Sequence, residues 1–170
     1  RVAFLDGGFP LWQAEGRPLD NAIPTRAPKQ FAGTPDPAML IDAAALHASL
    51  DSPELCLIDA RGPDRFRGEN ETIDPVGGHI PGARNRFFKD NLEPDGRFKP
   101  AAVLRAEYLA LMAGAAPAQV VAQCGSGVSA CLDLLVMEIA GLHGARLYAG
   151  SWSEWCSDPA RPVARKGSID

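Results

Sequence analysis

The apolar positions of this chain fall into short runs that alternate with segments of helical pattern. The apolar runs, each of a length typical of a buried parallel strand, are residues 55–60, 119–123 and 146–148. The segments with a helical pattern are residues 41–50, 63–67, 100–113 and 132–140. Strands that alternate with helices predict an α/β domain with a mostly parallel sheet.

The start of the chain resembles its own end. Gly7 and Trp12 match Gly150 and Trp155, and apolar or aromatic residues occupy corresponding positions around them. Each copy predicts a short strand, a glycine turn and a helix that carries a tryptophan. We therefore interpret residues 1–19 as the last elements of an upstream copy, and the chain as a fragment of a tandem protein.

The segment after this first copy has the composition of a linker. Residues 20–37 contain four prolines and predict an extended connection, so the complete domain spans residues 38–170. Within it, residues 68–98 are rich in Gly, Pro, Asn and Asp and predict a long surface excursion. We also expect residues 1–19 to dock on the remaining domain or on another chain, because their aromatic side chains would otherwise be exposed.

Composition and charge exclude several classes of partner. The chain has 170 residues, 46% of them hydrophobic, a size and composition that suit one soluble domain with attachments. A net charge of -4 argues against nucleic acid and anionic membrane surfaces as partners. No apolar run approaches the length of a membrane span, and the first residues lack the plan of a signal peptide, so we expect a cytoplasmic protein.

The cysteines predict free thiols rather than a metal site. None of them forms a Cys-x-x-Cys pair or has accompanying histidines, so no metal is expected. The four cysteines are Cys56, Cys124, Cys131 and Cys156. A regular helix would hold Cys124 and Cys131 about 10 Å apart, too far for a disulfide.

Cys124 is the candidate nucleophile. An apolar strand runs into it, a turn with Gly125 and Gly127 follows, and a helix comes next. The thiol would sit at a helix N-terminus, where unpaired N–H groups favour an anion and make a cysteine reactive. The two glycines are expected to permit the backbone angles of a tight loop whose amides point inward. The alternative is a buried structural cysteine at a strand end.

A second group of polar residues follows the first predicted strand. Asp59 and Cys124 both lie at carboxyl ends of parallel strands, the edge where such sheets bind ligands. We expect Asp59 to bond loop amides and to help hold the Cys124 loop. Arg61 and Arg67 are expected to form structural pairs or to be solvated, and His79 to brace a turn.

Five motifs, in order along the chain, resemble one protein family. The segments are residues 57–61, 65–68, 78–83, 124–130 and 150–155. Together they are similar to the carboxy-terminal, catalytic domain of tandem rhodanese-type sulfurtransferases. The resemblance implies a rhodanese-like domain with helices on both faces of a central parallel sheet. It also implies a site that lies between two domains, with the missing upstream rhodanese-like domain as a partner.

The resemblance further implies a chemistry and a set of residues. A sulfane sulfur would pass from a small-molecule donor to a thiol or cyanide acceptor through a persulfide on Cys124, with no cofactor and no metal. The Gly-Ser-Gly-Val loop is similar to that of mercaptopyruvate sulfurtransferases, in which Ser126 would assist proton handling and Arg65 would hold the substrate carboxylate. The other expected site residues are the substrate-binding Gly125, Gly127, Val128 and Ser129 and the supporting Asp59 and Arg61.

Some features leave alternatives open. Residues 69–75 contain no basic residue, although some family members carry a second substrate arginine there. Thiosulfate:cyanide sulfurtransfer and a non-catalytic rhodanese-like binding module are therefore alternative hypotheses. A cysteine phosphatase would close a similar loop of amides with an arginine six positions after the cysteine. This chain has Ala130 there, so a bound phosphate would lack that contact.

Overall fold

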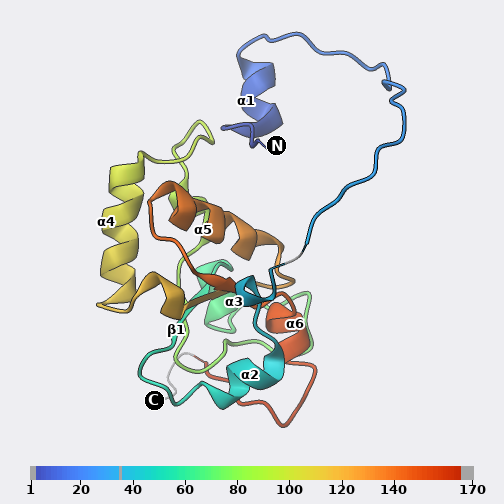
Figure 1. The fold of residues 1–170 in the computed structure, drawn as a ribbon. Helices are drawn as coiled ribbons and strands as arrows, with labels where there is room; N and C mark the ends of the chain where they lie inside the picture. Colours follow the sequence, from blue (N-terminus) through green and yellow to red (C-terminus); the bar gives the residue numbers. More distant parts are fainter. Residues whose placement is uncertain (1–2, 35, 166–170) are drawn as a thin grey trace.

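A four-stranded parallel sheet with strand order β2-β1-β3-β4 forms the centre of the protein (Figure 1). The computed structural model describes residues 3–34 and 36–165. The strands are β1 (Cys56–Asp59), β2 (Arg84–Asn85), β3 (Val120–Gln123) and β4 (Arg146–Leu147). The predicted α/β fold with a parallel sheet is confirmed.

The described residues form six α-helices and three short 3-10 helices. The α-helices are α1 (Gly8–Ala14), α2 (Ala43–Ala48), α3 (Pro63–Phe66), α4 (Ala101–Met112), α5 (Val128–Ile139) and α6 (Ser151–Trp155). The 3-10 helices are η1 (Pro37–Met39), η2 (Phe88–Asn91) and η3 (Pro117–Gln119). None of the described helices is long and apolar enough to cross a membrane.

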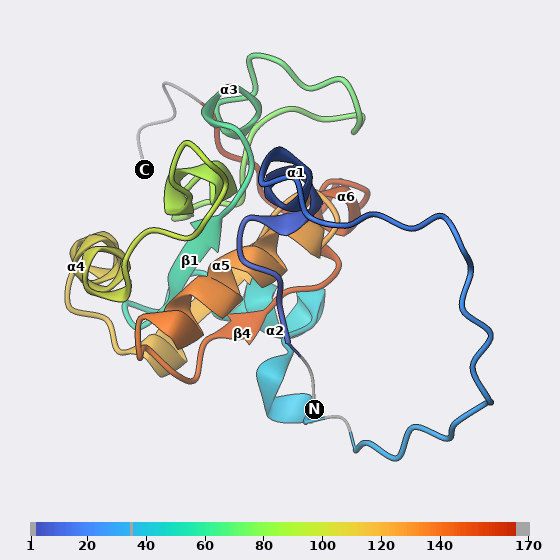
Figure 2. The ribbon, with the colours of Figure 1, turned by 90° about the horizontal axis from the view of Figure 1, so that it is seen from above.

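The two faces of the sheet are covered by different helices. Leu57 and Val121 point to one face and pack in a cluster with residues of α2 and α6. Ile58 and Val120 point to the other face and pack with residues of α4 and α5. Figure 2 shows α5 crossing the sheet with α4 beside it. Burial on both faces explains why the strands are continuous apolar runs in the sequence.

The stretch of residues 68–98 differs from its prediction as a surface excursion. Its second half supplies the edge strand β2, in which Arg84 pairs with Ile58 of β1. Ile80 is fully buried in the core, and Asn91 of η2 is also fully buried. The prediction missed these elements because two-residue strands and single core residues leave no periodic pattern in a Gly- and Pro-rich sequence.

The two similar ends of the chain share a turn, a helix and a hydrogen bond. Trp12 Nε1 donates to the carbonyl of Pro18 at 2.9 Å, and Trp155 Nε1 donates to the carbonyl of Pro162 at 2.8 Å. Gly7 forms the expected turn before α1 with a φ of 82°. Residues 3–5 form no strand, so that part of the prediction is wrong for the described residues.

The first segment lies against the loop that precedes α4. Asp6 Oδ1 accepts the N–H of Phe98 at 2.9 Å, and Glu15 pairs with Arg97 at 2.6 Å. The rings of Phe4 and Phe98 are 5.4 Å apart. The predicted docking of this segment therefore takes place on the same chain.

The connection from α1 back to the domain is extended and exposed. Residues 20–34 have no regular secondary structure (Figure 1). Residues 1, 2, 35 and 166–170, which belong to the predicted segments, lie outside the described residues. The boundaries at residues 19, 37 and 170 stay predictions.

Candidate active site

Cys124 follows β3 directly, at the carboxyl edge of the sheet. The N–H of Ala60 donates to the carbonyl of Gln123 at 2.9 Å, which places Ala60 beside the cysteine. The side chain of Cys124 is only 3% exposed and packs in a small cluster with Ala60, Ala122 and Ala130. All four cysteines are free thiols, as predicted.

The loop after Cys124 is anchored to the start of α6. The carbonyls of Cys124 and Gly125 accept the N–H groups of Trp152 and Ser153 at 3.0 and 2.9 Å. The N–H of Cys124 donates to Ser151 Oγ at 3.1 Å, and this hydroxyl donates to the carbonyl of Tyr148, the residue that follows β4. Ser151 is fully buried, so these bonds hold the backbone of Cys124 in place at the carboxyl edge of the sheet.

Sequence reasoning did not identify Ser151 as a site residue. Its backbone has a φ of 54°, in the left-handed region that residues other than glycine seldom adopt. Left-handed backbone at a non-glycine residue marks a place where the surroundings enforce the conformation. The one available signal was the position of Ser151 within the motif of residues 150–155.

The two loop glycines have different roles. Gly127 has a φ of 82°, and a Cβ added there would lie 2.6 Å from the carbonyl oxygen of Ala149. The predicted need for glycine therefore holds at Gly127. Gly125 has no left-handed φ, and a Cβ there would be 3.6 Å from Arg65 Nη1, an ordinary contact. The prediction that Gly125 provides a special backbone angle is wrong.

The amides of the loop are available to an anion. Helix α5 begins at Val128, and Gly127 caps it without any side-chain hydrogen bond. Within the described residues, the N–H groups of residues 125–130 donate no hydrogen bond. Unpaired N–H groups at a helix N-terminus carry partial positive charge and stabilise anions. The loop of residues 125–130, which we call the cradle, thus carries no charged side chain but has amide N–H groups with partial positive charge.

The other predicted loop residues lie at the mouth of this cradle. Ser126 is exposed, and Val128 is 75% exposed although it is apolar. Ser129 is half-buried on the first turn of α5. Cys131 lies two residues after Ser129 and donates from Sγ to the carbonyl of Gly127 at 3.3 Å.

Asp59 and Arg61 form a buried ion pair below the loop. Arg61 Nη2 lies 2.7 Å from Asp59 Oδ2, and the N–H of Arg61 donates to Asp59 Oδ1 at 2.9 Å. The guanidinium also donates to the carbonyl of Gly78 and lies 4.6 Å above the ring centre of Trp152. The predicted structural pairing of Arg61 is confirmed.

Asp59 accepts a loop amide, as expected, but that amide belongs to Arg61 and not to the Cys124 loop. Its carboxylate bonds Arg61, including the backbone N–H of that residue, and makes no hydrogen bond with the Cys124 loop within the described part of the chain. The side chain of Arg61 folds back over the strand end and takes both carboxylate oxygens. Asp59 can therefore support the loop only through Arg61 and the packing around it.

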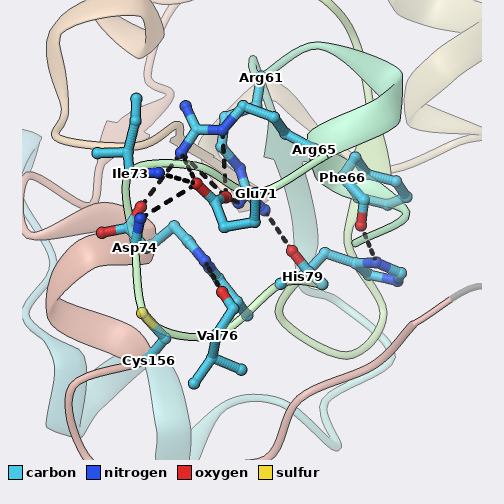
Figure 3. Close-up of polar contacts among 12 residues, drawn as sticks. Arg61, Arg65, Phe66, Glu71, Ile73, Asp74, Val76, His79 and Cys156 are labelled. Carbon is cyan, nitrogen blue, oxygen red and sulfur yellow. Dashed lines mark hydrogen bonds and ion pairs between the residues drawn. The ribbon is translucent and has the colours of Figure 1, made fainter. Parts of the chain in front are cut away.

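Arg65, in the single turn of α3, pairs with two carboxylates, those of Glu71 and Asp74 (Figure 3). Its Nε and Nη2 donate to Glu71, with Nη2 2.8 Å from Oε1, and Nη2 also lies 3.2 Å from Asp74 Oδ2. The side chains of Glu71 and Asp74 are 5% and 7% exposed. Nη1 makes no hydrogen bond within the described residues and faces Gly125.

Glu71 is the second site residue that sequence reasoning missed. Burial raises the pKa of Glu71, but hydrogen bonds from Arg65 and from the amides of Ile73 and Asp74 outweigh that effect and hold the pKa below its usual value. Glu71 is therefore ionised at neutral pH. The stretch that lacks a second arginine instead provides a carboxylate that neutralises the first one.

His79 braces the turn at the far side of this network, as predicted. Its Nδ1 lies 2.8 Å from the carbonyl oxygen of Phe66, and the two rings stack with centres 3.8 Å apart. The backbone of His79 pairs with that of Ala164. Nearby, Trp152 Nε1 donates to the carbonyl of Val76 at 2.9 Å. In the described part of the chain, no group of His, Cys, Asp and Glu side chains could hold a metal ion.

Comparison with known families now decides the class of the domain. The sequence model described as "Rhodanese-like domain" matches residues 42–158. The chain belongs to this family. The matched residues include the whole sheet, the Cys124 loop and α6.

Relatives of the rhodanese-like domain include named sulfurtransferases. A probable 3-mercaptopyruvate sulfurtransferase of Pseudomonas aeruginosa is 53% identical over 163 residues, which cover 96% of this chain and 57% of that protein. A thiosulfate sulfurtransferase of Cricetulus griseus is 33% identical over 157 residues, which cover 91% of this chain and 52% of that protein. The chain thus spans little more than half the length of these curated relatives.

Solved structures share the fold. A variant of EanB in complex with ergothioneine superposes with a TM-score of 0.80 and 22% identity, over 95% of this chain and 40% of that one. At this level of identity the likeness concerns the fold alone.

Proposed function

We propose that the chain is the catalytic part of a sulfurtransferase. It would move a sulfane sulfur from 3-mercaptopyruvate to a thiol or to cyanide through a persulfide on Cys124. The observation that carries the proposal is the run of amides that directly follows this cysteine, residues 125–130 at the start of α5, whose N–H groups donate no hydrogen bond within the described residues. The membership of the family and the names of the relatives support the same chemistry.

In the first half-reaction the thiolate of Cys124 attacks the sulfur of 3-mercaptopyruvate. A sulfur–sulfur bond forms as the carbon–sulfur bond of the donor breaks, and the leaving enolate takes a proton to give pyruvate. The Ser126 hydroxyl, exposed at the mouth of the cradle, is suited to help move this proton. In the second half-reaction an acceptor thiolate or cyanide removes the outer sulfur and restores the Cys124 thiolate.

The cradle suits the persulfide intermediate. Its anion carries diffuse negative charge, which the N–H groups of residues 125–130 can stabilise without donating a proton. The apolar side chains around Cys124, among them Ala60 and Ala130, exclude water from the sulfur. The reaction needs no metal and no organic cofactor.

The neutral loop favours mercaptopyruvate over thiosulfate as the donor. Residues 125–130 contain no basic side chain, and Glu71 and Asp74 hold two nitrogens of Arg65. Such a site is better suited to a monoanionic carboxylate than to a dianion. Arg65 Nη1, which faces the loop, is the group that we assign to the donor carboxylate.

The partners and the compartment follow from the same proposal. The family's tandem plan and the partial coverage of the relatives support an upstream rhodanese-like domain as a partner of this one. The mechanism needs Cys124 as a free thiol, which supports a cytoplasmic location, where thiols are kept reduced. The proposed donors and acceptors are small molecules.

Steady-state turnover tests the proposed function. The chain would be assayed for pyruvate release from 3-mercaptopyruvate and for thiocyanate formation from cyanide with either donor. We expect turnover with 3-mercaptopyruvate to exceed that with thiosulfate, to vanish in Cys124→Ser and to persist in Cys131→Ser. Turnover that survives in Cys124→Ser would contradict the proposal, and a reversed donor order would favour the thiosulfate alternative.

A further inference from the structure

Helix η2 lies at the same edge of the sheet as Cys124. The register of β1 and β3 pairs Asp59 with Gln123, so the next residues, Ala60 and Cys124, are neighbours. On the other side of Ala60, its carbonyl accepts the N–H of Phe88 at 3.1 Å. The ring of Phe88 packs against the small cluster that contains Cys124.

Lys89 extends from this helix over the Phe88 ring. Its Nζ lies 5.9 Å from the ring centre, so the aliphatic stem follows an aromatic surface while the ammonium group stays in water. The residue is exposed, and no carboxylate of the described residues forms an ion pair with it.

The other cations of this region have carboxylate partners. Arg61 is paired with Asp59, and Arg65 is paired with Glu71 and Asp74. Farther along, Arg86 and Lys99 share Glu107. Around the Cys124 loop, two guanidinium groups thus face three carboxylates, and Lys89 contributes a positive charge that no carboxylate of the described residues neutralises.

We propose that Lys89 binds the anionic group of the sulfur donor at the entrance to the Cys124 site. This inference rests on the proposed function. A small anionic donor, with its sulfur at the cradle, would place its carboxylate between Arg65 Nη1 and the Lys89 ammonium. Lysine suits this position because a point charge on a flexible stem can follow donors of different shape, whereas a guanidinium favours one bidentate geometry.

The alternative is that Lys89 is an ordinary solvated lysine. The two interpretations differ in kinetics, because only a donor-binding lysine affects the concentration dependence of persulfide formation. They also differ in salt dependence, since a contact with the donor anion is screened by added salt.

The experiment measures the rate of persulfide formation on the chain against the concentration of 3-mercaptopyruvate, at low and high salt. The variants are Lys89→Met and Lys89→Arg, with Lys29→Met in the exposed connection as the matched control. We expect Lys89→Met to raise the half-saturating concentration by about two- to fivefold, the range of exposed ion pairs, with the limiting rate unchanged. Lys29→Met should behave like the unmodified chain, whereas Lys89→Arg, which keeps the charge but not the flexible point charge, should fall between the unmodified chain and Lys89→Met.

The outcomes separate this inference from the proposed function. A Lys89→Met variant with the half-saturating concentration and salt dependence of Lys29→Met would overturn the role of Lys89, while sulfur transfer itself remains. An unmodified chain that takes no sulfur on Cys124 would instead contradict the proposed function. Thermal unfolding serves as the check on folding, and we expect no change because the Lys89 side chain is exposed and makes no hydrogen bond within the described residues.

Discussion

Ser151 Oγ lies 3.1 Å from the backbone nitrogen of Cys124 and accepts its hydrogen bond, although the two residues are 27 positions apart. The same hydroxyl donates to the carbonyl of Tyr148 at 2.9 Å. One buried side chain thus joins the end of β4 to the first residue of the reactive loop. The backbone of Ser151 is left-handed, with a φ of 54°.

Ser151→Ala should weaken both stability and chemistry. The N–H of Cys124 would stay buried without an acceptor, which lowers the free energy of unfolding by about 1–3 kcal/mol. Persulfide formation should slow because the cysteine loses its anchor. Ser151→Gly is the matched variant, since it also lacks the hydroxyl but relieves the left-handed backbone, and it should unfold at a higher urea concentration than Ser151→Ala. Equal stability of Ser151→Ala and the unmodified chain would refute this role.

The two loop glycines should respond differently to alanine. Gly127→Ala places a Cβ 2.6 Å from the Ala149 carbonyl oxygen at a left-handed φ. We therefore expect either poor folding or a free energy of unfolding lower by about 1–3 kcal/mol. Gly125→Ala meets only Arg65 Nη1 at 3.6 Å and should fold normally. Urea unfolding of the two variants measures the difference, and similar losses at both positions would be inconsistent with the loop geometry.

Removing the charge of Glu71 should change how the site binds its donor. Glu71→Gln weakens the hold on Arg65, so more of the guanidinium can turn to a donor carboxylate and the half-saturating concentration of 3-mercaptopyruvate should fall. The variant should also lose about 1–3 kcal/mol of stability, because a charge-assisted hydrogen bond is weakened. Glu69→Gln, in an exposed pair with Arg67, is the control for a nearby charge change. An unchanged or higher half-saturating concentration in Glu71→Gln would show that the pairing does not limit donor binding.

The buried carboxyl of Asp133 should make the free energy of unfolding depend on pH. This carboxyl is fully buried on α5, and Asn91 Nδ2 donates to its Oδ1 at 2.7 Å. Burial raises the pKa of Asp133 from 3.8 to about 7. Between about pH 4 and pH 7 the folded chain keeps a proton on Asp133 that the unfolded chain releases. The contribution of this carboxyl to the free energy of unfolding is fully present below about pH 4 and is lost as the pH rises to about 7.

Asp133→Asn removes this titration while keeping an acceptor for Asn91. The free energy of unfolding of the variant, relative to that of the unmodified chain, should rise between pH 5 and 8, by about 1 kcal/mol or more. Chemical denaturation at several pH values measures this difference. A difference that does not vary with pH would contradict a buried, protonated Asp133.

The sequence predicted the parts of the fold that depend on continuous patterns. Strands β1 and β3 are buried on both faces, so their apolar runs were visible. The edge strand β2 consists of Arg84 and Asn85, and its membership of the sheet depends on backbone pairing with β1 rather than on side-chain character. Such a strand has no signature in the hydrophobic pattern.

The site, like the fold, was predictable only where its residues form a continuous pattern in the sequence. Cys124 and its loop stood out because a strand, a glycine turn and a helix are contiguous in the sequence. Ser151 and Glu71 did not, because their roles depend on contacts that only the folded chain creates. The bond of Asp59 to a loop amide was expected, but the sequence does not show that the Arg61 side chain folds back onto the same carboxylate.

Peptide mass mapping after incubation with 3-mercaptopyruvate tests the central claim, that Cys124 carries the transferred sulfur. The chain would be digested without reductant, and the peptides of all four cysteines compared before and after treatment with cyanide. We expect a gain of one sulfur, about 32 Da, on the Cys124 peptide alone, lost with cyanide and absent in Cys124→Ser. The account would be contradicted if the unmodified chain gained sulfur on the exposed Cys131 and none on Cys124, and if the gain on Cys131 persisted in Cys124→Ser.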